Sequence, residues 1–431
     1  MAHHPRPLQA HAPQWLDAMR IGHWYRLSGD RPDLGLSATR PGTRYLRDCD
    51  PACDPTLNPA RRPYAALRRL TGRYVQAPWS GRLGFPAITE AWNGAVLATR
   101  LGDSGSLVLF GGGHNDYFGS DVHAFDLATR EWTRISDGFV RGTLEDYGAG
   151  ACYPNAEYPD SSPLPPHTYG YVQYDEVGND YLILKGNTEL GPQVRAAAIP
   201  HMFNLDRRQW RRGPLHESAI LNSGGFTTWD SSRRILWGHS GDDGAGNAFI
   251  GFCPDGENTD GSFGRWGPLY PSKFSGVANH NAMQMDPTRD IVVVLVHKRD
   301  ALFAINPSDP AAPAVPLRSI GLRSRIAEYA AIEYAPSLQQ LIYYSPEDGA
   351  AVHAIAVPQA SGWSSLTAAE WQWRRYVGAG LNPIEDAKAC SRHAINWRHT
   401  FGRLRVASWG SIDVALLMRH IDTPVYALRL N

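Results

Sequence analysis

The chain of 431 residues lacks long apolar runs, and no stretch of 18 consecutive apolar residues occurs in it. That absence predicts no transmembrane helix and no membrane partner. The first ten residues contain no apolar core of the kind that a signal peptide needs. We therefore expect a cytoplasmic protein or, if a leader has been removed, a secreted or periplasmic one.

Cysteine is scarce, and its five positions are scattered: Cys49, Cys53, Cys152, Cys253 and Cys390. The odd number and the wide spacing argue against a disulfide framework, so free thiols are expected. An excess of charge is also missing, because 42 Lys and Arg residues balance 42 Asp and Glu residues. The balance gives no support for a nucleic-acid partner held by bulk charge, although a locally basic cleft stays open.

Turn-forming and aromatic residues are plentiful, with 42 Gly, 32 Pro and 14 Trp. Two segments repeat, at 125–134 and 203–212, and each has a Phe followed seven residues later by a Trp. An apolar strand and a glycine cluster, at 106–113, precede the first of them. A strand, a glycine cluster and a later strand that opens with Trp resemble a kelch blade, the four-stranded unit of one class of β-propeller.

Four further segments show a strand, a tight turn and a second strand, at 169–185, 225–239, 280–297 and 329–344. Their turns begin at residues 175, 230, 286 and 336, which are 55, 56 and 50 residues apart. This spacing is close to the length of a kelch blade. It predicts five blades, at about 92–136, 167–213, 222–268, 277–319 and 327–376.

A sixth blade is split between the two ends of the chain. Residues 399–408, 414–420 and 424–430 have the pattern of three strands, and residues 23–28 supply the missing outer strand. Closing the ring with both ends leaves no free sheet edge. We therefore predict an all-β fold, a single propeller domain over 1–431 with six or seven blades. Residues 29–90 form an irregular excursion in which a seventh blade could lie.

Polar residues gather at one end of this predicted propeller. Strands alternate in direction, so the starts of the innermost strands and the ends of the second strands share one end. Seven of the 16 histidines fall at such positions: His114, His167, His239, His280, His297, His399 and His420. A single histidine there is more simply explained as a satisfied buried group. The whole set favours a functional site, because loops on a rigid frame carry chemistry.

The most distinctive segment is the run Gly-Gly-Gly-His-Asn-Asp-Tyr at 111–117. Its glycines let the backbone approach another group closely, and His114 and Asn115 then offer a proton acceptor and an amide. A plain kelch turn needs no histidine. A phosphate-binding loop is disfavoured because no Lys-Ser/Thr pair follows the glycines.

This segment, the His-Thr-Tyr-Gly start at 167–170 and the blade shared by both ends of the chain resemble the propeller-type polysaccharide lyases, of which the ulvan lyases are the known kind. The resemblance covers about 87–431 and implies cleavage of a uronic-acid polysaccharide by β-elimination. It implies His114 and Tyr169 as the acid/base pair, with His167 beside them. Lys185 would neutralise the uronate carboxylate, where the family has Arg, and His123 would be the family's second histidine.

The chemistry agrees with these residue types. Removal of the weakly acidic proton next to a uronate carboxylate needs a base, an acid for the leaving oxygen, and a cation or amide on the developing enolate. We expect the remaining polar residues at this end to bind the substrate: Asn115, Lys185, His123, His239, His280, Asn281 and His399. The expected partner is an anionic polysaccharide or oligosaccharide, bound by a monomer. No cofactor is required, and a structural metal ion stays open.

Three alternatives remain. A non-catalytic propeller that binds a glycan or a protein is the commonest use of kelch repeats. A copper oxidase of the galactose-oxidase type needs a Tyr-Cys crosslink, for which only Cys152 and Tyr153 are suggestive. A zinc site built from His239, His280 and His297 lacks any regular ligand spacing. The fold alone does not choose among these functions.

Overall fold

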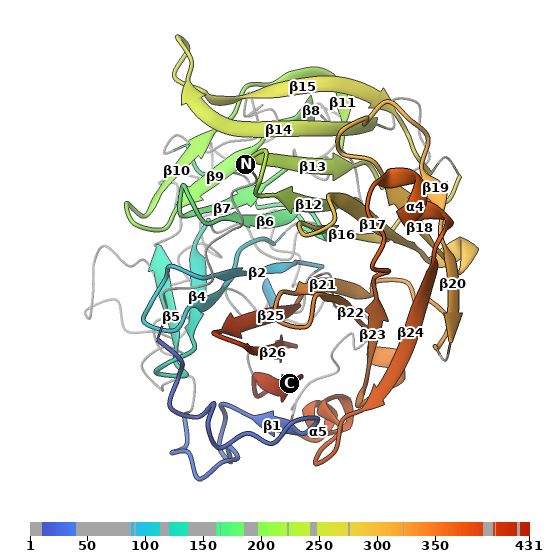
Figure 1. The fold of residues 1–431 in the computed structure, drawn as a ribbon. Coiled ribbons are helices and arrows are strands. Elements are labelled where there is room, and N and C mark those ends of the chain that lie inside the picture. The colour runs from blue at the N-terminus through green and yellow to red at the C-terminus, as the bar shows by residue number, and fades with distance from the viewer. Residues whose placement is uncertain are drawn as a thin grey trace, which may run out of the picture.

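The computed structural model describes residues 11–39, 88–89, 92–112, 120–136, 161–163, 165–184, 197–221, 224–241, 248–274, 276–321, 323–390, 400, 402–419 and 423–431. Within these ranges the fold is a six-bladed β-propeller, as the sequence predicts, and helices are few. Figure 1 shows the six sheets arranged as a ring. None of the described helices is long and apolar enough to cross a membrane.

Each blade is an antiparallel sheet of four consecutive strands, ordered from the axis outward. Blade 1 contains β2 (Ala95–Ala98), β3 (Ser106–Leu109), β4 (Val122–Asp126) and β5 (Trp132–Ser136). Blade 2 contains β6 (Val172–Asp175), β7 (Asp180–Ile183), β9 (His201–Asn204) and β10 (Gln209–Arg212). Blade 3 contains β12 (Phe226–Asp230), β13 (Ile235–His239), β14 (Ala248–Glu257) and β15 (Phe263–Pro271).

The second half of the ring follows the same plan. Blade 4 contains β16 (Ala282–Asp286), β17 (Ile291–Val296), β18 (Ala301–Ile305) and β19 (Val315–Pro316). Blade 5 contains β21 (Ala331–Ala335), β22 (Gln340–Tyr344), β23 (Ala351–Ala356) and β24 (Glu370–Val377). Blade 6 contains β25 (Leu404–Trp409), β26 (Ile412–Leu417), β27 (Tyr426–Arg429) and β1 (Trp24–Arg26).

A few elements lie outside this plan. β20 (Arg318–Gly321) adds to the outer edge of blade 5, parallel to β24. β8 (Ala197–Ala198) and β11 (His216–Ile220) form a separate two-stranded sheet. The described helices are two short 3-10 turns, η3 (His297–Arg299) and η4 (Pro346–Asp348), and the α-helices α4 (Trp363–Ala368) and α5 (Pro383–Cys390).

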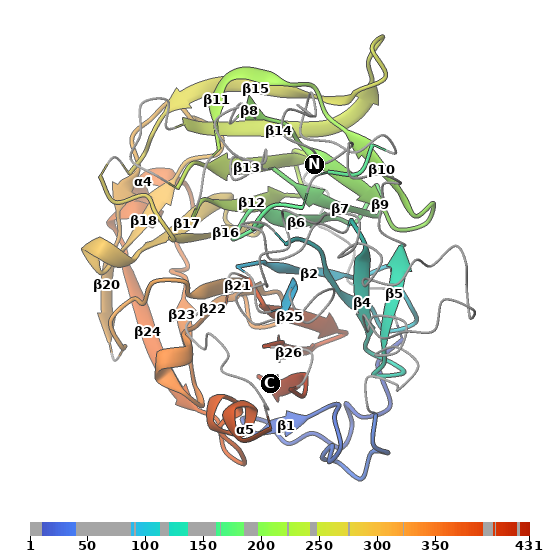
Figure 2. The ribbon, with the colours of Figure 1, turned by 180° about the vertical axis from the view of Figure 1, so that it is seen from behind.

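The ring closes through the innermost strands and through β1. Contacts between innermost strands run in order from β2 through β6, β12, β16, β21 and β25 and back to β2. β1 pairs antiparallel with β27, with Trp24 opposite Leu428, so the predicted pairing of 23–28 with 424–430 is confirmed. Both ribbon views place β1 beside α5 (Figures 1 and 2). The side chain of Arg26 in β1 binds Asp386 in α5.

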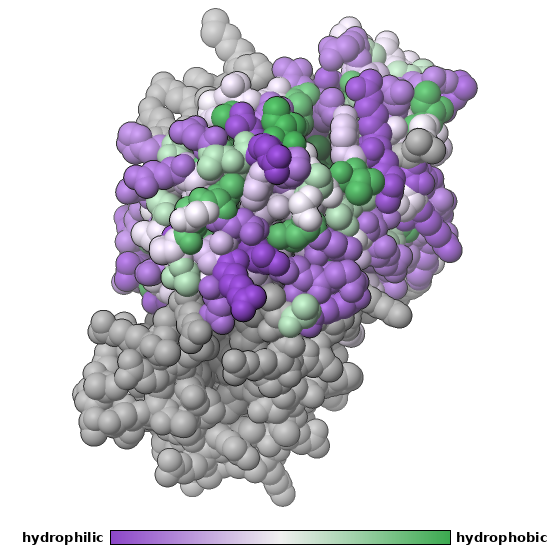
Figure 3. Space-filling model, turned by 90° about the horizontal axis from the view of Figure 1, so that it is seen from below, coloured by the Kyte–Doolittle hydropathy of each residue, from purple (hydrophilic) through white to green (hydrophobic). Residues whose placement is uncertain are grey.

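The core is divided among the interfaces between blades. Six apolar clusters of buried side chains occur, and each lies mainly between two neighbouring blades. Because both faces of an inner blade strand are covered, such a strand can be apolar throughout, as β17 is. The surface is mixed: Figure 3 shows scattered hydrophobic residues among hydrophilic ones on the face seen from below.

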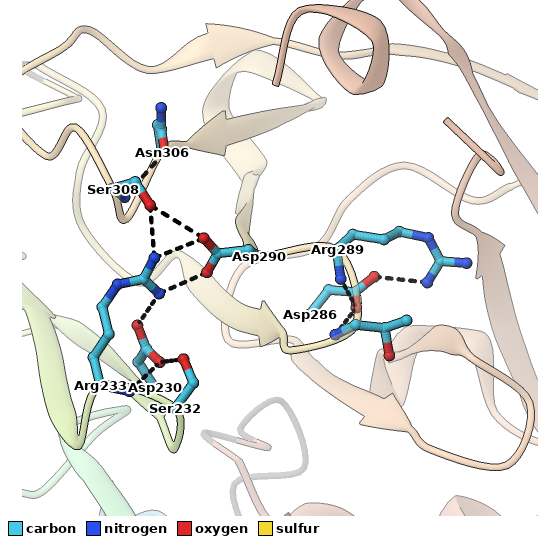
Figure 4. A network of polar contacts seen from close by, with 9 residues as sticks. Asp230, Ser232, Arg233, Asp286, Arg289, Asp290, Asn306 and Ser308 are labelled. Atoms are coloured by element: carbon cyan, nitrogen blue, oxygen red, sulfur yellow. Dashed lines mark hydrogen bonds and ion pairs between the residues drawn. The ribbon is translucent and has the colours of Figure 1, made fainter. Parts of the chain in front are cut away.

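Ion pairs fasten the turns between the first and second strands, at the end of the ring away from the inner-strand starts. Asp230 and Asp286, each at the end of an innermost strand, accept hydrogen bonds from backbone N–H groups of their own turns. Arg233 bridges blades 3 and 4, because its guanidinium binds Asp230 at 2.8 Å and Asp290 at 2.6 Å (Figure 4). These turns therefore have a structural role.

A double-mutant cycle should measure this bridge. Arg233 and Asp290 are 28% and 44% exposed, so water and salt screen their attraction. We expect Arg233→Ala and Asp290→Ala to show a coupling free energy of about 1 kcal/mol in urea unfolding at low salt, and less at high salt. A coupling of zero at low salt would contradict the assigned role.

Candidate functional site

The starts of the innermost strands form the mouth of an axial pocket. Its empty volume, part of which is open to solvent, is about 420 Å³. Gly170, Asn281, Tyr329 and Gly402 line it where the inner strands begin. Farther along these strands, Arg405 binds Glu333 and the carbonyl oxygen of Ala95, at 2.8 Å from its Nε atom. Arg405 thereby joins three blades and forms the floor of the pocket.

Five aromatic and histidine rings form a cluster at this mouth: Trp92, His167, Tyr169, His280 and Tyr329. The ring centre of Tyr169 lies 5.7 Å from His167, 5.8 Å from Trp92 and 5.8 Å from His280. His280 in turn lies 4.4 Å from Tyr329. The cluster therefore contains rings that precede the inner strands of blades 1, 2, 4 and 5.

The backbone at three of these residues is strained. Tyr169, His280 and Tyr329 have φ values of 45°, 56° and 62°, in the left-handed region that favours glycine. Other non-glycine residues with such values include Asn179, in a hairpin turn at the far end of blade 2. A turn explains the latter position. Three strained aromatic or histidine residues around one pocket are instead a pattern that often marks a functional site.

Local hydrogen bonds explain why the chain adopts this arrangement. The N–H of Tyr169 donates to the carbonyl of Trp92 at 2.8 Å, which joins blades 1 and 2. The N–H of Thr168 donates to Asn93 Oδ1, and Thr168 Oγ1 accepts from the N–H of Gly94. A side chain on Gly170 would contact the backbone of Phe226 at 3.2 Å. Three of the four residues in the His-Thr-Tyr-Gly motif, from Thr168 to Gly170, therefore help to hold neighbouring blades together.

The first glycine of the Gly-Gly-Gly run also has a structural explanation. Gly111 has a φ of 137°, and a Cβ atom there would overlap the side-chain amide of Asn93. His114 and Asn115, which follow this run, lie outside the described residues, as do Lys185 and His399. The structure therefore places Tyr169, His167, His280, Asn281, His239 and His123 among the predicted site residues.

Polar contacts orient the more exposed side of the cluster. Glu328, which is 44% exposed, accepts a hydrogen bond from Nδ1 of His280 at 2.7 Å. Asn281 is buried, and its Oδ1 atom lies 3.0 Å from Nδ1 of His297. Burial lowers the pKa of His297, while Glu328 acts in the opposite direction. The sequence patterns predicted His280 and Asn281 here, but they did not point to Tyr329 or Glu328.

Two predicted binding residues lie away from this cluster. His123 in β4 is buried and binds Asp121 at 2.5 Å, and burial lowers its pKa although Asp121 opposes the shift. His239 ends β13 at the expected end of blade 3, but it is completely buried. Its Nδ1 donates to the carbonyl of Ser240, and its Nε2 accepts from the N–H of Lys273. Neither ring contacts the described cluster.

His239 should make the fold sensitive to acid. Burial lowers its pKa to about 4, from an ordinary value of 6.5, because protonation of Nε2 would remove the acceptor for Lys273. The stabilisation by neutral His239 is complete above pH 6.5 and is lost as the pH falls toward 4. We expect His239 to lower the free energy of unfolding by about 2 kcal/mol at pH 5 relative to pH 7.5.

Urea unfolding of the parent and of His239→Gln at both pH values measures this contribution. The variant should be less stable at pH 7.5 and should lose less stability than the parent on going to pH 5. An equal loss in both proteins would assign the acid sensitivity to other groups.

Metal ligands do not gather in the described part of the chain. No group of three or more His, Cys, Asp or Glu side chains there is placed to hold a metal ion, and His239, His280 and His297 form no such group. The crosslink proposed for a copper oxidase, between Cys152 and Tyr153, falls outside the described residues.

Comparisons with known proteins give similarities of low identity. No family model matches the sequence, and no curated protein matches it. The solved structure of the major Malassezia sympodialis allergen Mala s 1 aligns with 76% of this chain and 89% of its own, with a TM-score of 0.39 and 10% identity. A nidogen/laminin complex structure aligns over 67% of this chain and 88% of its own, with a TM-score of 0.36 and 12% identity. At these values the two likenesses carry no argument about function.

Proposed function

We propose that the protein is a polysaccharide lyase that cleaves a uronic-acid-containing glycan by β-elimination at the mouth of the axial pocket. The observation that supports this proposal best is Tyr169, with its ring between His167 and His280 at 5.7 and 5.8 Å and its backbone in the left-handed region. Phenol and imidazole groups are suited to the acid and base roles of an elimination.

His280 is the more accessible of the two described histidines. Its side chain is 10% exposed, against 4% for His167 as a residue. Because Glu328 holds Nδ1 as the donor, Nε2 of His280 is left as the basic atom of the neutral ring. In the proposed reaction a histidine and Tyr169 exchange protons with the uronate carbon and the leaving oxygen. His114 stays the first candidate for that histidine on the sequence resemblance, with His280 as the described alternative.

Aromatic rings would support the sugar. Trp92 and Tyr329 are partly exposed and flank the histidines of the cluster. Apolar ring faces that stand beside polar groups form a common arrangement in ligand sites. They would hold the pyranose ring while the amide of Asn281 and the Lys185 side chain meet its carboxylate.

A non-catalytic glycan-binding propeller is the second candidate, and one observation favours it. Tyr169 is only 1% exposed, so the phenol of the free protein lies beneath the rings of the cluster. A binding surface needs only Trp92, His280 and Tyr329, which are partly exposed.

A panel of uronate polysaccharides separates the two functions. The protein should release products that absorb in the ultraviolet band of an unsaturated uronate, from at least one member of the panel. If a uronate glycan binds without any such product, the protein is a binding module instead.

A further inference from the structure

Beside the ring cluster, two exposed cations lie at the junction of blades 4 and 5. Lys298 is in η3, just after β17, and Arg325 precedes β21. Both positive charges act on His297 and oppose its protonation, which places both near that ring. His297 in turn contacts Asn281 at the pocket mouth. The two cations therefore belong to the surroundings of the proposed site.

The two segments that carry these cations are fixed to each other. Asp300 Oδ1 accepts hydrogen bonds from Arg323 Nη1 at 2.5 Å and from the N–H of Ile326 at 2.8 Å. The carbonyl of Asp300 accepts another from Arg323 Nη2 at 2.7 Å. Arg325 lies between the two tethered residues, and Lys298 is two residues before the acceptor. The cations are therefore carried on a preorganised frame.

The neighbouring charged groups already have partners. Asp300 pairs with Arg323, Glu328 binds His280, and the guanidinium of Arg299 lies 5.4 Å from the ring centre of Phe303. Among the described residues, no acidic side chain pairs with Lys298 or Arg325. Two exposed positive charges without a protein counterion, beside a pocket, create a local field that attracts anions.

We propose that Lys298 and Arg325 form a subsite for a second anionic group of the glycan, a carboxylate or a sulfate ester on a sugar next to the one at the ring cluster. This inference rests on the proposed function, since it makes the polymer the occupant. A guanidinium binds such planar or tetrahedral anions through two parallel hydrogen bonds, and an ammonium adds a point charge. The subsite selects chains that carry charge on neighbouring sugars over those with an isolated uronate.

The test compares Lys298→Ala/Arg325→Ala with the parent in affinity electrophoresis. The gels contain polygalacturonate, which carries only carboxylates, carrageenan, which carries only sulfate esters, or neutral dextran. Arg207→Ala is the matched control, because Arg207 is an exposed cation in the turn between β9 and β10, at the opposite end of the ring. The double variant should bind the preferred polyanion about tenfold more weakly than the parent and depend less on salt, and Arg207→Ala should match the parent. None of the proteins should bind dextran.

Each result has a separate meaning, because binding and cleavage are measured independently. Weaker binding by the double variant supports the subsite even if no glycan is cleaved, in which case only the lyase proposal fails. Equal binding by the parent and the double variant overturns the subsite and leaves the lyase proposal standing. If the parent binds neither polyanion, the subsite is wrong. Whether polygalacturonate or carrageenan shows the larger effect tells which anion the cations hold.

Discussion

Replacing Trp24 by alanine should lower the free energy of unfolding by about 3–5 kcal/mol, the usual cost of truncating a large buried aromatic side chain. Trp24 is 1% exposed, and β1, in which it lies, is the outer strand that completes blade 6. Its Nε1 atom donates to the carbonyl of Ala350 in blade 5 at 2.9 Å. The substitution therefore removes a contact between the last two blades together with the packing of the closing strand.

Chemical unfolding of the parent, Trp24→Ala and Ile21→Ala measures the effect. Ile21 is 60% exposed and is three residues away, so its truncation should change the stability by no more than about 0.5 kcal/mol. If Trp24→Ala falls within 1 kcal/mol of the parent, β1 does not carry the closure of the ring.

Replacing Tyr169 by phenylalanine should lower kcat/KM by about a hundredfold or more on any glycan that the parent cleaves, because the acid/base hydroxyl is gone while the ring remains. The ring contacts with Trp92, His167 and His280 do not involve that oxygen, so the fold should be retained. Initial rates of formation of the unsaturated product, with thermal melts of the same samples, give the comparison.

Tyr174→Phe is the control for this experiment. Tyr174 is on the same innermost strand, β6, and its hydroxyl donates to Asn179 Oδ1 at 2.8 Å near the far end of the blade. Its loss should cost about 1 kcal/mol of stability and leave the rate near that of the parent. Near-parent activity in Tyr169→Phe would remove Tyr169 from the acid/base roles and favour the binding function.

The blades could be predicted from the sequence because each repeats a local pattern. A turn with Asp, Pro, Gly or Ser recurs about every 50 residues, and strands that are buried on both faces are apolar throughout, as in Ile291–Val296. The split blade followed from a count of strands, which left residues 23–28 as the only partner for 424–430. β20 was not predicted, because its pairing with β24 is parallel and depends on tertiary packing.

Only part of the site could be predicted in the same way. The alternation of strands correctly sets the end of the ring at which a residue lies, which brought His167, Tyr169 and His280 together. It does not set the depth of a side chain within the blade, so His123 and His239 proved to be buried. Tyr329 follows no local motif, and its partnership with His280 arises only when blades 4 and 5 pack together.

The source of the oxygen in the product tests β-elimination most directly. Elimination breaks the glycosidic bond without adding water, whereas hydrolysis adds one water to each bond that is cut. After digestion of a uronate polysaccharide in heavy-oxygen water, mass spectrometry should show fragments with an unsaturated uronate at the new non-reducing end and no heavy oxygen from cleavage. Saturated fragments that carry one heavy oxygen for each bond cut would contradict the lyase assignment.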